Sequence, residues 1–151
     1  MHPPILTITI PTYNRFETVC ANINRLVPQL SPDVCLLVID NASTDGTRNL
    51  TEWVRDNHPD APIRVIRNVT NVGAGANVTR SFELVDTPWV WTLSDDDPVH
   101  PDAVDGILDV IDYCGLKKDA LIESGKKIDA FDPPLIHTVR GVGYRLRMPP
   151  K

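Results

Sequence analysis

The chain has 151 residues, of which 42 % are hydrophobic and 23 % charged, proportions that are ordinary for a globular protein and exclude wholesale disorder or a fibrous repeat. Its net charge of −5 conceals two parts of opposite sign: residues 1–114 carry 7 Arg, no Lys and 16 acids (−9), whereas residues 115–151 carry 8 basic residues and 4 acids (+4). We therefore expect a first domain over 1–114, large enough to bury a core, and a separate basic tail over 115–151.

Segments that would direct the chain to a membrane or out of the cell are not found. No apolar run approaches the roughly 18 residues of a membrane span, and the start MHPPILTITI lacks a basic stretch. We expect a cytoplasmic protein with no transmembrane segment. The three cysteines, Cys20, Cys35 and Cys114, fit neither a disulfide framework nor a zinc pattern, and we expect buried, reduced thiols.

Apolar runs and helical patterns alternate along the first part of the chain. The runs predict strands over residues 5–10, 34–40, 63–67 and 89–93, and the patterns predict helices over 16–27, 44–57, 74–85 and 101–113. Pro11 should end the first strand, because proline cannot continue a central ladder. The alternation predicts an α/β fold with a mainly parallel sheet, right-handed crossovers and helices on both faces.

Ligands of such open sheets bind at the carboxyl ends of the strands, so the loops after the strands are the candidate sites. The first loop, PTYNR (11–15), contains no glycine, which disfavours a dinucleotide-binding turn. The second loop, DNASTDGT (40–47), begins with Asp40, whose carboxylate can accept a hydrogen bond from the edge of a base. The other polar residues of this loop are explained as helix caps or turn residues. The third, NVTNVGAGAN (68–77), has two glycines that would admit a ligand, or simply a turn and a helix start.

The fourth loop contains three consecutive acids, Asp95, Asp96 and Asp97, after an apolar strand. Adjacent carboxylates repel one another unless a cation neutralises them, and hard oxygen ligands suit Mg²⁺ or Mn²⁺. The alternative is that one or two of the acids cap the helix that begins near Pro101. The triplet indicates a metal and diphosphate site.

Taken together, the four loops resemble those of the family 2 glycosyltransferases. The segments ITIPTYNR, LLVIDNASTDGT, NVTNVGAGAN and WVWTLSDDDPVHPD occur in the family's order and spacing, and the resemblance covers residues 5–112. It implies the nucleotide-sugar-binding, Rossmann-like half of a GT-A fold. The implied ligand is a nucleotide-diphosphate sugar, with UDP-sugars the usual donors, and the implied cofactor is Mn²⁺ or Mg²⁺.

The resemblance also implies roles for single residues. Pro11, Thr12, Tyr13 and Asn14 would line the nucleotide base, and Asp40 would bind the edge of that base. Asn71 and Gly73 would face the nucleotide, Asp95 would lie near the ribose, and Asp96, supported by Asp97, would bind the metal.

The acceptor-binding half of that family, with the acid that acts as general base, lies well downstream of the acidic motif, and no residue of the last forty resembles it. We therefore expect impaired transfer and assign neither a catalytic residue nor an acceptor. Homodimerisation is one way to cover the surface that the missing half would bury.

The tail resembles a different family. The segment KKIDAFDPPLIHTVRGVGYRLR (126–147) is similar to the end of the winged-helix domain of OmpR/PhoB-type response regulators, and predicts a short β-hairpin. The resemblance implies DNA contacts by Arg140, Lys126 and Lys127. Because the preceding helices are absent, we do not expect DNA as a partner. The alternatives are a fragment of a DNA-binding regulator and a chimeric fragment without activity.

Overall fold

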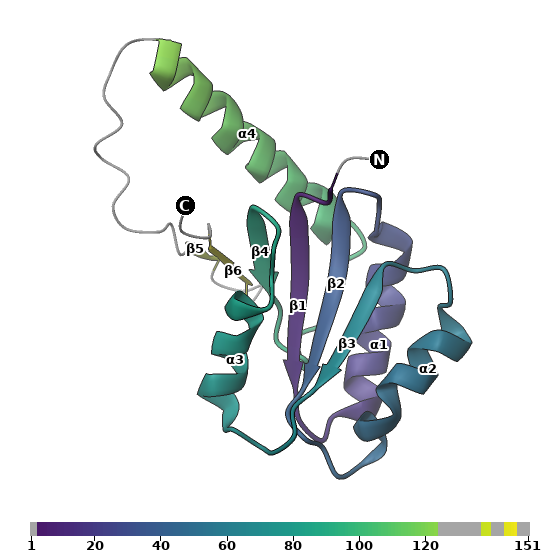
Figure 1. Ribbon diagram of the computed structural model, residues 1–151. Helices are drawn as coiled ribbons and strands as arrows, with labels where there is room; N and C mark the ends of the chain where they lie inside the picture. Colours follow the sequence, from purple (N-terminus) through teal and green to yellow (C-terminus); the bar gives the residue numbers. More distant parts are fainter. Residues whose placement is uncertain (1–2, 124–136, 140–143, 148–151) are drawn as a thin grey trace.

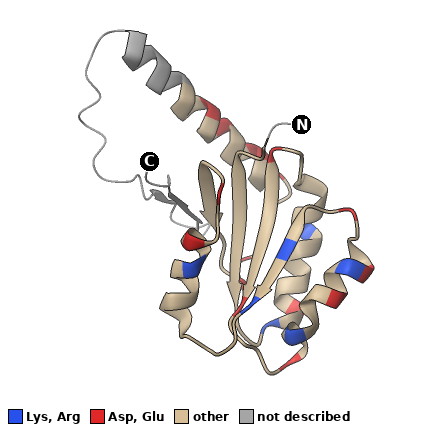
Figure 2. Cartoon of the chain, viewed as in Figure 1, with Lys and Arg blue, Asp and Glu red and all other residues tan. Residues whose placement is uncertain are grey.

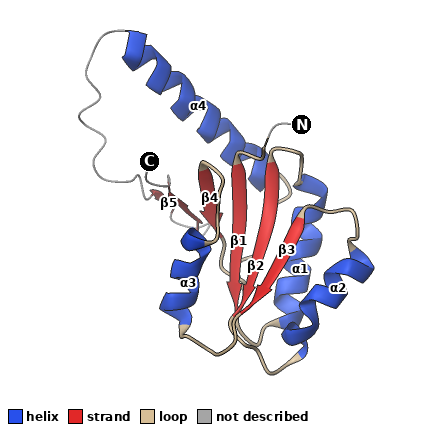
Figure 3. Ribbon diagram, in the orientation of Figure 1, coloured by secondary structure: helices blue, strands red, loops and turns tan. Residues whose placement is uncertain are grey.

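The computed structural model describes residues 3–123, 137–139 and 144–147. Its elements in chain order are β1 (Leu6–Thr12), α1 (Phe16–Leu26), the 3₁₀ helix η1 (Val27–Gln29), β2 (Val34–Asp40), the 3₁₀ helix η2 (Gly46–Asn49), α2 (Leu50–Asn57), β3 (Ile63–Arg67), α3 (Ala74–Glu83), β4 (Trp89–Thr92), α4 (Ala103–Glu123), β5 (His137–Val139) and β6 (Tyr144–Arg147). Figures 1 and 3 show the strands side by side with the helices around them.

The sheet has the strand order β3-β2-β1-β4-β6-β5. The first four strands are parallel, and β6 pairs antiparallel with both β4 and β5. The predicted α/β fold with a mainly parallel sheet and a C-terminal hairpin is therefore confirmed. Along the sheet, β2 and β3 follow on one side of β1, whereas β4 lies on its other side. Right-handed crossovers therefore place α1 and α2 on one face of the sheet and α3 on the other.

The two faces of β1 have different chemistry. Leu6, Ile8 and Ile10 are fully buried in an apolar cluster that also contains residues of α1, α2 and α4. The alternate residues Thr7 and Thr9 lie on the other face of the strand. Their hydroxyls bond to those of Thr87 and Thr92, at 2.7 and 3.0 Å. The apolar core thus lies on one side of the sheet, and buried polar groups lie on the side of α3.

The first strand does not end at Pro11, as its sequence predicts, but continues to Thr12. β4 pairs with β1 only as far as Thr9, whose carbonyl accepts from the Leu93 amide. Pro11 has the same orientation as Thr9, so its nitrogen faces the side on which β4 has already ended. The pairing with β2 continues through Pro11 and Thr12, so proline is tolerated at this position.

Two predicted helices also differ from the observed ones. The helix expected over 44–57 is divided into η2 and α2, with Gly46 packed so closely that an added Cβ would lie 3.0 Å from the Phe16 ring. The last helix, expected to end at residue 113, begins at Ala103 and runs to Glu123, past the change of composition at Cys114 without a break. The division into parts 1–114 and 115–151 stays a prediction.

All three cysteines are free thiols, but only Cys20 is buried, whereas Cys35 and Cys114 are partly exposed. Burial raises the pKa of Cys20 to about 12, with a smaller contribution from Glu17, so this thiol is unreactive at neutral pH. Within the described residues, no helix has the length and apolar character needed to cross a membrane.

Candidate functional site

A hollow of about 520 Å³ lies at the carboxyl ends of the central strands, where ligands of open α/β sheets bind. Five of the residues predicted from the sequence line it, namely Pro11, Thr12, Tyr13, Asn71 and Asp95. They come from three segments that are widely separated in the sequence: the end of β1 with the residue after it, the loop after β3 and the loop after β4. Polar residues that the sequence did not single out also line the hollow, among them Arg15, Asn41, Asn77 and Ser94. Figure 2 shows acidic and basic residues meeting at this end of the sheet.

Asp95 joins the ends of β1 and β4. Its Oδ2 accepts a 2.7 Å hydrogen bond from the Thr12 hydroxyl. Burial raises the pKa of Asp95 above its ordinary value, and the opposing effects of the Thr12 hydroxyl and of nearby Arg15 do not cancel that rise. The hollow therefore contains one partly desolvated carboxylate in a fixed position.

Asp96 and Asp97 lie beside it at the edge of the hollow. Asp96 is exposed, and a hydrogen bond from the Ser94 hydroxyl lowers the pKa of its carboxyl group, as does Arg15 to a smaller degree. The Arg15 guanidinium lies 3.9 Å from Asp96 Oδ2. Asp97 is half-buried, and its amide lies 3.4 Å from the Ser94 carbonyl.

The acid triplet supplies oxygen donors of the type that Mg²⁺ and Mn²⁺ prefer. Among the described residues, however, no three His, Cys, Asp or Glu side chains are gathered closely enough to hold a metal ion by themselves. The donor set fits a hard cation that takes its remaining ligands from a diphosphate or from water. The expected roles, in which Asp96 binds the metal with support from Asp97 and Asp95 lies near the ribose, stay a prediction.

Asn22 fixes the backbone of the acidic loop from the opposite side. This residue of α1 is 1 % exposed, and its side-chain amide donates to the carbonyls of Asp95 and Asp97 at 3.1 and 3.0 Å. The sequence places Asn22 on the buried side of an amphipathic helix but gives no indication of partners more than 70 residues away. The one feature of the sequence that marks Asn22 is that it is a polar residue within the apolar stripe of this helix.

Three asparagines line the hollow, Asn41, Asn71 and Asn77, and a fourth, the buried Asn68, bonds to two of them. Asn68 donates to the side-chain oxygens of Asn41 and Asn77, at 3.0 and 2.8 Å, and Asn41 donates to Asn71 at 3.0 Å. Asn77 in turn donates to the Ile39 carbonyl of β2. The network ties the loops after β2 and β3 to α3, and so fixes the position of Asn71 at the hollow.

Gly73 ends the loop after β3 in a backbone conformation that other residues rarely adopt. Its φ is +87° and its ψ 156°, and it directly precedes α3. Its amide donates to Asn71 Oδ1 at 2.8 Å. The glycine is therefore required by the turn that presents Asn71.

Five of the predicted site residues do not line the hollow, namely Gly73, Asp96, Asp97, Asp40 and Asn14, and the last two are held by other groups. Asp40 is 1 % exposed, accepts from the Ser43 amide and pairs with the Arg67 guanidinium. Asn14 lies in the left-handed region with φ 52°, and its side-chain oxygen accepts from the Thr44 amide at 2.8 Å. Both hold the loop after β2 in this structure, and their expected contact with a base stays a prediction.

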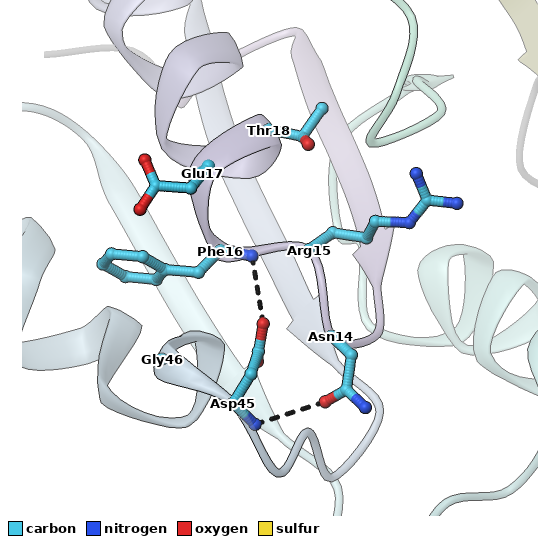
Figure 4. A pocket seen from close by; sticks show the side chains of 7 residues that line it. All are labelled: Asn14, Arg15, Phe16, Glu17, Thr18, Asp45 and Gly46. Carbon is cyan, nitrogen blue, oxygen red and sulfur yellow. Dashed lines mark hydrogen bonds between the residues drawn. The ribbon is translucent and has the colours of Figure 1, made fainter.

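A second hollow, of about 470 Å³, adjoins the start of α1 (Figure 4). Its lining includes Asn14, Phe16 and Asp45, with Asp45 accepting from the Phe16 amide and donating its own amide to Asn14. Arg15 lines both hollows. Lys126, Lys127 and Arg140, the residues connected with DNA, lie outside the described residues, and that resemblance stays a prediction.

The sequence profile of glycosyl transferase family 2 matches residues 7–115. Among curated proteins, the abequosyltransferase RfbV of Salmonella typhimurium is 32 % identical over 102 residues, which are 66 % of this chain and 30 % of that protein. An uncharacterised glycosyltransferase of Haemophilus influenzae is 30 % identical over 108 residues, 72 % of this chain and 35 % of the relative. The chain thus spans about a third of the length of these relatives.

Solved structures show the same fold. The mannosyltransferase PcManGT of Pyrobaculum calidifontis, in complex with GDP-Man and Mn²⁺, has a TM-score of 0.59 at 20 % identity, over 68 % of this chain and 30 % of that one. S. aureus TarS in complex with UDP-GlcNAc has a TM-score of 0.62 at 23 % identity, over 72 % of this chain and 31 % of that one. At these identities the likeness establishes the fold alone.

Proposed function

Because the chain belongs to glycosyl transferase family 2, we propose that the larger hollow binds the nucleotide-diphosphate part of an activated sugar, together with Mn²⁺ or Mg²⁺. The observation that carries this proposal is the bond between Thr12 and Asp95. It brings the loop expected to hold the base and the loop expected to hold the metal into one pocket.

The chemistry of the lining supports the division of roles. Thr12, Tyr13 and Asn71 supply hydrogen-bonding groups and a ring that is 42 % exposed, a combination suited to a nucleoside. Asp95 and Asp96 supply carboxylates at the edge of the hollow. When bound there, a divalent cation neutralises the diphosphate and makes it a better leaving group. Without a cation, the acid triplet repels the same diphosphate.

We propose UDP as the first nucleotide to test, since uracil is the usual base in the family that the loops resemble. The mannosyltransferase with the same fold holds GDP-Man and Mn²⁺, so GDP is the second.

Donor binding and sugar transfer are separate properties in this proposal. Within the described part of the chain, Asp95 is the one carboxylate that lines the larger hollow, and we assign it to the ribose and metal. A general base for the acceptor hydroxyl therefore has no candidate among those lining residues. We propose that the chain binds the sugar donor and transfers its sugar slowly, since the loss of a general base lowers the rate by a factor of about 10²–10⁴.

The test is a thermal-shift series with UDP and GDP, each with and without Mn²⁺. We expect a rise in melting temperature that requires both nucleotide and metal, and that Asp96→Asn removes. Asp60→Asn is the matched control, because Asp60 is an exposed acid before β3, at the opposite end of the sheet. A shift that occurs equally in Asp96→Asn and in the control would reject the metal assignment.

A further inference from the structure

Arg15 lies where the two hollows meet, between β1 and α1. Its main chain is held on both sides, because its amide donates to Thr47 Oγ1 at 3.2 Å and its carbonyl accepts from the Val19 amide at 2.9 Å. Its side chain is 51 % exposed. The guanidinium can therefore change position without disturbing the strand or the helix.

The guanidinium is close to the acid triplet but bonded to it only loosely. The 3.9 Å from its Nη1 to Asp96 Oδ2 is within ion-pair range but beyond hydrogen-bond range, and exposed pairs of this kind contribute little to stability. Among the described residues, Arg15 is the one cation in an ion pair with the triplet. Figure 4 shows its guanidinium pointing away from Phe16 and Asp45.

A divalent cation bound to Asp96 would occupy the surroundings of this guanidinium. The two positive charges repel, so the metal displaces the side chain from the carboxylate. A diphosphate bound to that metal brings new anionic oxygens to the same place. The planar guanidinium fork suits phosphate oxygens, which it can bind through two parallel hydrogen bonds.

We propose that Arg15 is an exchangeable counter-ion of this site, which neutralises Asp96 in the empty pocket and moves to the diphosphate when a metal-bound nucleotide enters. This inference rests on the proposed function and adds a diphosphate-binding residue to it. Arg15 then has opposite effects on two ligands: it weakens the binding of metal alone and strengthens the binding of the metal–nucleotide complex.

The Arg15→Gln variant separates these effects. Without the competing charge, Mn²⁺ alone should bind about threefold more tightly. Without the charged hydrogen bonds, UDP in saturating Mn²⁺ should bind about tenfold more weakly or worse. Uridine, which has no phosphate, should bind equally well. Arg15→Lys keeps the charge but not the fork, and should retain the wild-type Mn²⁺ affinity while recovering only part of the UDP affinity.

The experiment measures free Mn²⁺ by its EPR signal and UDP and uridine binding by calorimetry. The matched control is Arg48→Gln, which removes an exposed arginine of η2 for which no contact with the acid triplet is found. If neither UDP nor GDP binds the wild-type chain with Mn²⁺, the proposed function fails and this inference fails with it. If the wild type binds and Arg15→Gln leaves both affinities unchanged, or moves both in the same direction, the inference alone is overturned.

Discussion

The Thr12 hydroxyl and the Asp95 carboxylate are 2.7 Å apart, although 83 residues separate them in the sequence. The bond connects the carboxyl end of β1 with the third residue after β4, which ends at Thr92. It holds the carboxylate at the hollow while burial works against its ionised form. Three of the following predictions concern this carboxylate and the loop to which it belongs.

Thr12→Val should weaken metal-dependent UDP binding by about tenfold, because a hydrogen bond to a charged group contributes about 1.5–3 kcal/mol. Thr12→Ser keeps the hydroxyl and should bind nearly as the wild type does. Thr7→Val serves as control. Thr7 lies on the same strand as Thr12, and the substitution removes a buried hydroxyl that bonds to Thr87. Calorimetry that finds Thr12→Val and Thr7→Val equally impaired would argue for a general structural effect.

Asp95→Asn should raise the melting temperature at neutral pH and abolish metal-dependent binding. The pKa of Asp95 is raised in the folded state, so the folded chain holds this proton more tightly than the unfolded chain does. The contribution of this group to the free energy of unfolding therefore falls as the pH rises from the pKa of Asp95 in the unfolded state through its higher pKa in the folded state. Above that range, ionised Asp95 destabilises the fold. The asparagine carries no such penalty.

This stability difference between Asp95→Asn and the wild type should narrow as the pH falls to about 4, where the carboxyl group begins to be protonated in both states. Melting curves followed by circular dichroism at pH 7 and pH 4 check this expectation. Asp60→Asn controls for the loss of one acidic charge. A lower melting temperature for Asp95→Asn at pH 7 would contradict the assigned cost of burial.

Gly73→Ala and Gly75→Ala should change stability in opposite directions. Neither added Cβ would meet an atom within 4 Å, so the difference lies in the backbone alone. Gly73 has a positive φ, and an alanine there should cost about 1–3 kcal/mol. Gly75 lies in the first turn of α3, where alanine should stabilise by up to about 1 kcal/mol. Urea unfolding of both variants measures this, and equal effects would refute it.

Asn22→Ala should lower the free energy of unfolding by about 1–3 kcal/mol, because two partly buried carbonyls lose their donor. If Asn22 also positions the acid triplet, UDP with Mn²⁺ should lose affinity while uridine does not. Asn24→Ala is a control on the same helix, where Asn24 bonds to His58 on the surface. Equal loss of uridine and UDP binding would leave Asn22 a purely structural role.

The arrangement of strands and helices was predictable because it depends on local patterns. The β-branched run ending at Ile10 and the helical spacing of Val19 and Ile23 each indicate an element and the side that it buries. The acid triplet was likewise visible as an anomaly of charge after an apolar strand. Five predicted lining residues meet at one hollow because parallel strands bring their carboxyl ends to one edge.

The polar contacts between loops were not predictable in the same way. Asn68 connects Asn41 with Asn77, and Asn22 bonds to the acidic loop, but such partners are set by tertiary packing. The effect of Pro11 on the strand depends on whether another strand lies on the side that its nitrogen faces, which the sequence of β1 alone does not show. Asp40 ends β2 and Asn14 lies in the loop after β1, as the sequence predicts, but the sequence could not show that their oxygens accept hydrogen bonds from neighbouring groups.

The most direct test of the central claim is calorimetric titration of UDP into the chain, in excess Mn²⁺ and again in excess EDTA. We expect one binding site in Mn²⁺ and no detectable binding in EDTA. At a hundred times its dissociation constant the ligand should stabilise the fold by about 2.7 kcal/mol, a rise in melting temperature of roughly 5 to 10 °C. If UDP and GDP both fail to bind in Mn²⁺, or bind equally well in EDTA, the hollow between β1, α3 and β4 is not a metal-dependent nucleotide-diphosphate site.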